Sequence, residues 1–196
     1  NFNKKETNYI FVLDEHGDLN HSSFFEWKDN QLKKVSNSKI EKFTLDNRDY
    51  VTSLGAVYSN FTEALGLRRS VDEGKVEALA AYGKPLPVLT NKLEKYINNC
   101  FFERFSKIDY RVYFNDLWKE WSRREEKFDK SEINSKLSMD LAASIQLLFE
   151  ESILKSIKNF DYKINNNLCL SGGSFLNCNI NSRIINETNY KNVHHF

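Results

Sequence analysis

The stretch that most constrains the fold is Leu168–Gly173, in which a short apolar run ends at two consecutive glycines. Leu168–Leu170 is predicted to be a buried strand, and Ser171-Gly172-Gly173 the turn that follows it. Ser174 is expected to cap a helix whose apolar residues continue to Ile184. A strand, a glycine pair and a helix start present free backbone N–H groups at the positive end of a helix dipole, which can hold a phosphate. The same glycine pair, taken alone, more often makes only a tight turn.

Length and composition are those of a globular protein that can bury a core. The 196 residues, 40% of them hydrophobic and 28% charged, fit one domain. A net charge of +1 provides no broad basic field for nucleic acid or for an anionic membrane. No run is apolar and long enough to span a bilayer, and no basic-then-apolar leader opens the chain, so neither a membrane anchor nor secretion is predicted.

The cysteines and the chain ends add two expectations. Cys100, Cys169 and Cys178 are odd in number and lack the spacing of a metal site, which favours a reducing, cytoplasmic location. Cys169, within the apolar run, is predicted to be a small core residue. The chain begins at Asn1 and closes on an apparent strand, Asn192–Phe196, with no turn after it, as expected of a piece of a longer protein.

Apolar periodicity predicts a strand meander, then helices, then a strand–helix–strand unit. The first strands are Tyr9–Leu13, Ser22–Trp27 and Leu32–Val35, with a turn predicted at Asp29-Asn30 between the second and the third. The helices before the glycine pair are Tyr50–Leu67, Gly74–Tyr82, Leu89–Phe105 and Ser138–Ile157. Gly66 is expected to end the first helix, and Ser138 to cap the last. This order predicts an α/β fold with a mixed sheet covered by helices.

Two further positions carry side chains that suit a phosphate ligand. Asp14 ends the first strand and opens a turn toward Gly17, where a carboxylate can hold a metal ion or its water near a phosphate. The simpler interpretation is an ordinary turn aspartate. At the start of the second helix, Gly74 allows a ligand to approach, Lys75 can neutralise phosphate and Glu73 can bind ribose hydroxyls. The alternative there is a capped surface helix with an ordinary ion pair.

Histidines and tryptophans give weaker signals. His194 and His195 are neighbours on a predicted strand, so their side chains point to opposite faces and are not expected to share a metal ion. Because no zinc-type ligand set accompanies them, no metal site is predicted in this segment. The irregular stretch 105–136 holds Trp118 and Trp121 beside mixed charges and is interpreted as a helical insertion with a solvated face; a partner surface is the alternative.

Four ordered segments together carry more information than any single motif. They are Ser53–Gly66, Asp72–Gly83, Asp140–Gln146 and Leu170–Asn181. In order and spacing they resemble the nodulation-type O-carbamoyltransferases, which also act in antibiotic biosynthesis. The resemblance covers roughly Asp14 to the C-terminus. It implies that residues 1–196 are one domain, mainly the second lobe of a ribonuclease H-like, actin-like ATPase domain related to the threonylcarbamoyl-transfer proteins of tRNA modification.

The resemblance also implies a chemistry. Members of this family form a carbamoyl-adenylate from carbamoyl phosphate and ATP on a separate C-terminal domain, and then transfer the carbamoyl group to an acceptor hydroxyl at a metal-containing site on the domain resembled here. Matched position by position, the nucleotide-binding residues are Asp14, Gly74, Lys75, Gly172, Gly173 and Asn177. The family's metal-binding histidine pair lies upstream of this segment and its metal-binding aspartate just beyond Phe196. The segment alone is therefore predicted to be inactive, with the metal ion held in the full-length parent.

The sequence departs from the family pattern in three places. Two residues are inserted between Asp14 and Gly17, Glu77-Ala78 replaces the usual Met-Gly, and Ser174-Phe175 replaces smaller residues.

Two other functions stay open. One alternative is a tRNA threonylcarbamoyl-transfer relative, which should carry a basic face. The other is a non-enzymatic interaction module centred on the two tryptophans. The implied partners are a small-molecule acceptor and carbamoyl phosphate, and neither nucleic acid nor a membrane is predicted to bind.

Overall fold

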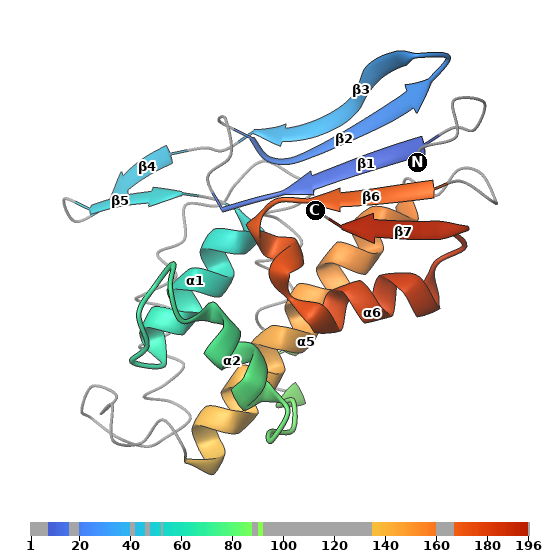
Figure 1. Ribbon diagram of the computed structural model, residues 1–196. Coiled ribbons are helices and arrows are strands. Elements are labelled where there is room, and N and C mark those ends of the chain that lie inside the picture. Colours follow the sequence, from blue (N-terminus) through green and yellow to red (C-terminus); the bar gives the residue numbers. More distant parts are fainter. Residues whose placement is uncertain are drawn as a thin grey trace. The chain divides into compact units, whose positions relative to one another are not determined.

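The computed structural model describes residues 8–15, 20–39, 42–45, 48–51, 53–87, 90–91, 135–159 and 167–195 (Figure 1). By its internal contacts the chain divides into two compact units. Unit 1 comprises residues 1–41, 52–55 and 150–196, and unit 2 comprises residues 42–51 and 56–149. Several sequence predictions lie outside the described residues: Gly17, Cys100, Trp118, Trp121, the insertion 105–136 up to residue 134, and the helix 89–105 apart from residues 90 and 91.

The first three strands of unit 1 form the predicted antiparallel meander. They are β1 (Asn8–Leu13), β2 (Asn20–Lys28) and β3 (Gln31–Lys39). Asp29 and Asn30 both have positive φ, at 50° and 64°, as the two-residue hairpin turn between β2 and β3 requires. The predicted turn at these residues is therefore confirmed, with strands that extend a few residues beyond the predicted ends.

A parallel strand–helix–strand unit completes the sheet. It consists of β6 (Asn167–Ser171), α6 (Cys178–Glu187) and β7 (Asn192–His195). The strand order is β3-β2-β1-β6-β7, and β6 pairs in parallel with both β1 and β7. The α/β class and the mixed sheet are therefore as predicted. Among the described residues no helix is long and apolar enough to cross a membrane.

The core of unit 1 lies between this sheet and its helices. Figure 1 shows α6 and the second half of α5 (Lys136–Asn159) on the same side of the sheet. The strand residues Phe11 and Phe24 are almost fully buried, with ring centroids 5.8 Å apart. From the helices, Ile157 of α5 and Ile184 of α6 are completely buried. This apolar burial is the main favourable term for holding α5 and α6 on the sheet.

A row of asparagines crosses the parallel strands at their amino ends. Asn8, Asn167 and Asn192 occupy the same register position on β1, β6 and β7. Asn167 donates its amide N–H to the Asn8 side-chain oxygen at 2.7 Å and accepts from the Asn192 amide at 2.8 Å. Because a register shift would leave these amides unpaired, the row favours one alignment of the three strands.

The described residues of unit 2 form two helices, the first half of α5 and a hairpin. The helices α1 (Leu54–Ala64, from Ala56 onward) and α2 (Glu73–Ala80) are joined by a loop. Tyr58 of α1 packs its ring 4.8 Å from that of Phe149 and donates its hydroxyl to the Gln146 side-chain oxygen at 2.7 Å. Gly83 lies so close to α5 that an added Cβ would stand 1.9 Å from the Met139 carbonyl oxygen. This close contact explains why residue 83 is a glycine, for which the sequence predicts only the end of a helix.

Two predicted helix starts are wrong. The helix expected from Tyr50 begins at Leu54, because Arg48–Val51 forms β5, which pairs with β4 (Lys42–Leu45). Ser138 does not cap α5. Instead Ser135, just before the helix, accepts a hydrogen bond from the Ser138 N–H at 3.2 Å. The carboxyl end of α1 is as predicted. Gly66 follows the helix and has a φ of 80°, in the left-handed conformation that often terminates helices.

Candidate nucleotide site

The predicted phosphate turn stands beside the end of β1. Asp14 follows β1 and Gly172 follows β6, and these two strands are parallel neighbours, so their carboxyl ends lie at the same edge of the sheet. From this edge the chain continues to β2 on one side of the pair and, through α6, to β7 on the other. Such a divergence of connections is where open α/β sheets bind their ligands.

Gly172 is held in a conformation and a space that only glycine fits. Its φ of 101° lies in the region that other residues rarely adopt. A Cβ at this position would stand 2.2 Å from the Leu13 carbonyl oxygen. The end of β6 is thus pressed against the end of β1, and this contact fixes where the turn leaves the sheet.

Gly173 brings the turn next to the Asp14 carboxylate. A Cβ on Gly173 would lie 3.4 Å from Asp14 Oδ1, an ordinary van der Waals distance. The same Oδ1 accepts a hydrogen bond from the Glu15 N–H at 2.7 Å, which fixes the orientation of the carboxylate. Three of the predicted nucleotide-binding residues, Asp14, Gly172 and Gly173, therefore come together at one strand edge.

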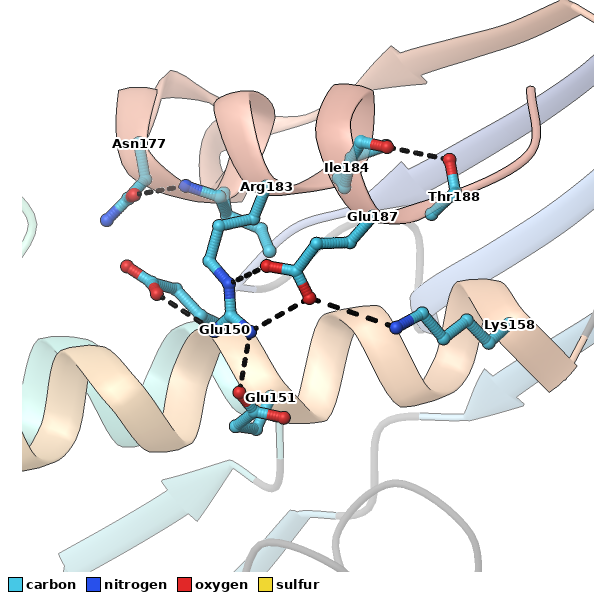
Figure 2. Close-up of polar contacts among 9 residues, drawn as sticks. Glu150, Glu151, Lys158, Asn177, Arg183, Ile184, Glu187 and Thr188 are labelled. Atoms are coloured by element: carbon cyan, nitrogen blue, oxygen red, sulfur yellow. Dashed lines mark hydrogen bonds and ion pairs between the residues drawn. The ribbon is translucent and has the colours of Figure 1, made fainter. Parts of the chain in front are cut away.

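The turn does not lead directly into a long helix, and Ser174 does not cap one. Residues Gly173–Leu176 form a short 3-10 helix, and α6 begins only at Cys178. Asn177 caps α6, since its Oδ1 accepts from the Ile180 N–H at 3.1 Å (Figure 2). The dipole of α6 therefore starts several residues beyond the glycines, and an anion at the glycines depends less on it than the sequence suggests.

Two side chains hold the 3-10 helix, and sequence reasoning assigned neither of them a role. Phe175 is buried and packs its ring 5.6 Å from that of Phe11. Asn181 donates its side-chain amide to the Phe175 carbonyl oxygen at 2.8 Å. Its Oδ1 is buried without a hydrogen-bond partner among the described residues. The larger residue that departs from the family pattern at position 175 is thus accommodated in the core.

The other predicted residues, Gly74 and Lys75, belong to unit 2, where the protein's own carboxylates occupy the start of α2. Asp72 accepts hydrogen bonds from the Arg68 guanidinium at 2.9 and 3.1 Å and pairs with Lys75 at 2.9 Å. Arg68 in the first place, and then Lys75, lower the pKa of Asp72 well below its usual range. Glu73 Oε1 accepts from the Ser70 N–H at 2.6 Å. The alternative of a surface helix start with an ion pair therefore describes this region well.

Gly74 itself is open. An added Cβ there would meet no atom within 4 Å. Nothing in the described residues requires glycine at this position, in contrast to Gly172. The structure thus groups Asp14, Gly172, Gly173 and Asn177 in one unit, and Gly74 and Lys75 in the other.

An ionic cluster fastens α6 to α5, and Figure 2 shows its members converging between the two helices. Arg183 donates to both oxygens of Glu187, at 2.6 and 3.1 Å, and reaches Glu150 at 3.1 Å and Glu151 at 2.7 Å. Lys158 lies 3.8 Å from Glu187. The hydrogen bond from Arg183 lowers the pKa of Glu187. Only the spacing of Arg183 and Glu187 on one helix face could have signalled this cluster in the sequence.

Cysteines and histidines add no metal site to the described part of the chain. Cys169 is buried as predicted, and burial raises the pKa of its thiol, which disfavours the reactive thiolate. His194 and His195 lie on β7. Within the described ranges, no three His, Cys, Asp or Glu side chains are close enough to hold a metal ion.

Comparison with known proteins decides the family. The sequence model of the carbamoyltransferase N-terminus matches residues 2–196. The chain belongs to this family. As a carbamoyltransferase N-terminal segment, it is 32% identical over 202 residues to uncharacterized protein MJ1058 of Methanocaldococcus jannaschii, a match that covers 100% of this chain and 31% of that protein.

A second relative gives the same picture. Uncharacterized protein sll1178 of Synechocystis is 33% identical over an alignment of 152 residues, and the match covers 72% of this chain and 24% of that protein. The carbamoyltransferase segment therefore spans less than a third of the length of the curated relatives it matches. The resemblance predicted from the four ordered segments is confirmed at the level of the family.

Proposed function

We propose that this chain is the carbamoyl-transfer part of an O-carbamoyltransferase, and that the turn after β6 binds a phosphate of ATP or carbamoyl-adenylate. The observation that carries the proposal is the convergence of Asp14, Gly172 and Gly173 at neighbouring strand ends in a chain of the carbamoyltransferase family. Divergent connections at such strand ends favour a ligand at this edge of the sheet.

The reaction that we propose for the full-length protein has two stages. In the first, water releases inorganic phosphate from carbamoyl phosphate, and an oxygen of the resulting carbamate bonds to the α-phosphorus of ATP, which gives carbamoyl-adenylate and pyrophosphate. In the transfer, the acceptor's hydroxyl oxygen bonds to the carbamoyl carbon, the bond between that carbon and the phosphate oxygen of the adenylate breaks, and AMP leaves. The hydroxyl proton passes to a base, which we do not assign to this chain. The 196 residues alone are proposed to be inactive.

Each loop residue has a distinct part in this proposal. Gly173 has no side chain, so a phosphate can approach its backbone N–H. Asp14 is itself anionic, and because like charges repel, a phosphate beside it needs a cation or a water molecule in between. Asn177 uses its side-chain oxygen to cap α6, so we assign it the role of shaping the loop.

The divalent ion of the family needs more than this chain's described residues supply. Asp14 is a single carboxylate, and the described residues hold no group of three metal-ligating side chains. We therefore propose that any metal site is completed by residues elsewhere in the longer protein, and we assign no step of the reaction to the ion.

The structure gives less support for nucleotide binding by Gly74 and Lys75. Lys75 is 62% exposed and paired with Asp72 at 2.9 Å, so a phosphate would have to draw it away from that carboxylate. The open space at Gly74 leaves room for a ligand atom. We keep both only as a separate, weaker candidate for a nucleotide contact within unit 2.

The proposal extends to the fold. A mixed five-stranded sheet with helices between its strands supports the ribonuclease H-like lobe of an actin-like ATPase domain. The chain covers less than a third of its relatives, which supports its being one part of a longer enzyme.

The test is enzymatic and uses the full-length protein. Incubation with ATP and isotopically labelled carbamoyl phosphate should release pyrophosphate, and an acceptor hydroxyl compound should then gain the label while AMP forms. Omission of carbamoyl phosphate is the control. Pyrophosphate release that does not depend on carbamoyl phosphate, together with no labelled product across a panel of hydroxyl acceptors, would contradict the proposed function.

A further inference from the structure

A serine distant in sequence supports the Asp14 turn. Ser53 lies just before α1, belongs to unit 1 and is completely buried. Its hydroxyl donates a hydrogen bond to the Glu15 carbonyl oxygen at 2.8 Å, across 38 residues of sequence. A buried hydroxyl that pairs with a turn carbonyl restricts how far that turn can move.

A second contact from the same segment reaches the same residue. An added Cβ on Gly55 would stand 3.0 Å from Glu15 Cα and 3.1 Å from Glu15 N. Those distances are tighter than ordinary van der Waals contact, so any side chain at Gly55 would press on the turn backbone. The segment Ser53–Gly55 therefore supports Glu15 through a hydrogen bond and through close packing.

Glu15 in turn orients the proposed ligand carboxylate. Its N–H donates to Asp14 Oδ1 at 2.7 Å, while its carbonyl oxygen accepts from Ser53. Asp14 Oδ1 is the atom nearest to a Cβ built on Gly173. A continuous set of contacts thus runs from Ser53 through the Glu15 peptide groups to Asp14 and the glycine turn.

We infer that Ser53 is a positioning residue for nucleotide binding: it fixes the Glu15 backbone and thereby holds the Asp14 carboxylate beside the Gly173 phosphate position. The inference rests on the proposed function and adds a residue that touches no substrate. Misplacement of a binding group by about 1 Å can reduce a rate about a hundredfold. A hydroxyl that acts through one peptide unit should have a smaller effect, about tenfold in nucleotide affinity.

The first measurement is hydrogen exchange in the full-length protein without nucleotide. In Ser53→Ala, the Glu15 amide should exchange about tenfold faster. The Glu15 carbonyl oxygen loses its hydrogen bond from Ser53, so the Asp14–Glu15 turn should open more often. Ser53→Thr keeps a hydroxyl and should restore slow exchange. Gly55→Ala keeps Ser53 but presses on the turn, and it should also increase exchange at Glu15.

A matched control separates support of the turn from burial of a serine. Ser156 is almost fully buried in unit 1, and its hydroxyl donates to the Ser152 carbonyl oxygen at the same 2.8 Å, but within its own helix. Ser156→Ala removes an equivalent hydrogen bond and should leave exchange at Glu15 unchanged. General destabilisation would instead raise exchange equally in both variants.

The second measurement is calorimetric titration of the full-length variants with ATP and Mg²⁺, fitted with two sites because the family resemblance also implies an ATP site on the C-terminal domain. Ser53→Ala should weaken binding about tenfold, Ser53→Thr should recover it, and Ser156→Ala should bind as the unmodified protein does. Unchanged exchange at Glu15, equal effects of the two serine-to-alanine variants, or unweakened ATP binding by Ser53→Ala would each overturn the inference.

One further variant separates failure of this inference from failure of the proposed site. Gly173→Asp places a negative charge at the proposed phosphate position and should weaken ATP binding without involving Ser53. If Gly173→Asp weakens binding and Ser53→Ala does not, the positioning role is wrong and the site stands. If Gly173→Asp binds ATP normally, the proposed site itself is wrong, whatever the exchange at Glu15.

Discussion

The turn after β6 and the start of α2 both place a glycine at the beginning of a helical segment, yet they are built in opposite ways. At the turn, Gly172 is pressed against the Leu13 carbonyl oxygen and has a φ of 101°. At α2, a Cβ added to Gly74 would meet no atom within 4 Å. The first glycine is required by the fold itself, whereas the second is required, if at all, by something outside the described residues.

The charges at the two places differ as well. Beside the turn stands the Asp14 carboxylate, whose Oδ1 is held by the Glu15 N–H. At α2, Asp72 is already neutralised by Arg68 and Lys75, and Glu73 occupies the Ser70 N–H. The carboxylates at the helix start already hold the protein's own donors, whereas Asp14 at the turn can hold a cation between itself and a phosphate, although sequence patterns rank the two places alike.

Gly172→Ala should have the largest effect. The Cβ would meet the Leu13 carbonyl oxygen, and the residue would be held at an unfavourable positive φ, so stability should fall by about 3 kcal/mol or more. Thermal unfolding of the full-length protein, followed by circular dichroism, measures the loss. A variant as stable as the unmodified protein would show that the β1–β6 contact is not rigid, and the contrast with Gly74 would disappear.

Arg183→Ala should have the next largest effect, because α6, which follows the turn, is tied to α5 by this guanidinium. Arg183 is 24% exposed, so we expect a loss of about 1–2 kcal/mol, between the values for surface and buried ion pairs. Arg183→Lys is the control and should recover only part of the stability, because an ammonium group cannot pair with both oxygens of Glu187 in the same geometry. Full recovery by lysine would mean that charge alone holds α6.

Gly74→Ala tests the open glycine at the start of α2, in contrast to the tightly packed Gly172. With no atom near the new Cβ, stability should be unchanged or rise by up to about 1 kcal/mol, since alanine favours helix. Thermal unfolding checks this, and ATP titration of the same variant shows whether a ligand uses the open space. Weaker ATP binding with unchanged stability would mean that Gly74 contacts ATP directly. A loss of stability would mean that Gly74 packs against a neighbour, which contradicts the open space that we describe around it.

The smallest effect concerns pH. Hydrogen bonds from Arg68 and Lys75 lower the folded-state pKa of Asp72, so its contribution to stability is present above the unfolded value of about 3.9 and is lost as the pH falls through the lower folded value. Asp72→Asn should therefore unfold at lower temperature than the unmodified protein at pH 7, and the difference should shrink below about pH 4. A difference that stays constant across this range would mean that the pair contributes through packing.

Local patterns predicted those parts of the structure that depend on local chemistry. The aromatic and branched apolar run Tyr9–Leu13 and the pair Asp29-Asn30 predict a strand and a turn without reference to other residues, and the structure has both. The residues around Val51 suit either a helix face or a strand. They form a strand because they pair with Lys42–Leu45, and no local pattern reveals this pairing. The predicted helix start at Tyr50 was wrong for this reason.

The same distinction holds within the candidate site. The glycine turn and the nearby Asp14 could be predicted, because glycines and a strand-ending aspartate are visible in the sequence. The roles of Ser53 and Arg183 could not, because each depends on contacts between segments that are far apart in the chain. Asn177 was predicted as a nucleotide residue, and the structure gives it a helix-capping bond that any strand–loop–helix junction could use.

The central claim is that nucleotide phosphate binds at the Gly172-Gly173 turn, and a pair of substitutions at Gly173 tests it most directly. An added Cβ there would make ordinary contact with Asp14 Oδ1, so Gly173→Asn and Gly173→Asp should both fold, and they differ chiefly in charge. Calorimetric titration of the full-length protein with ATP and Mg²⁺ is fitted with two sites, because the adenylate is expected to form on another domain. We predict that one of the two sites binds ATP at least about tenfold more weakly in Gly173→Asp than in Gly173→Asn, because a second carboxylate repels the phosphate. Equal affinities for the two variants would contradict the claim.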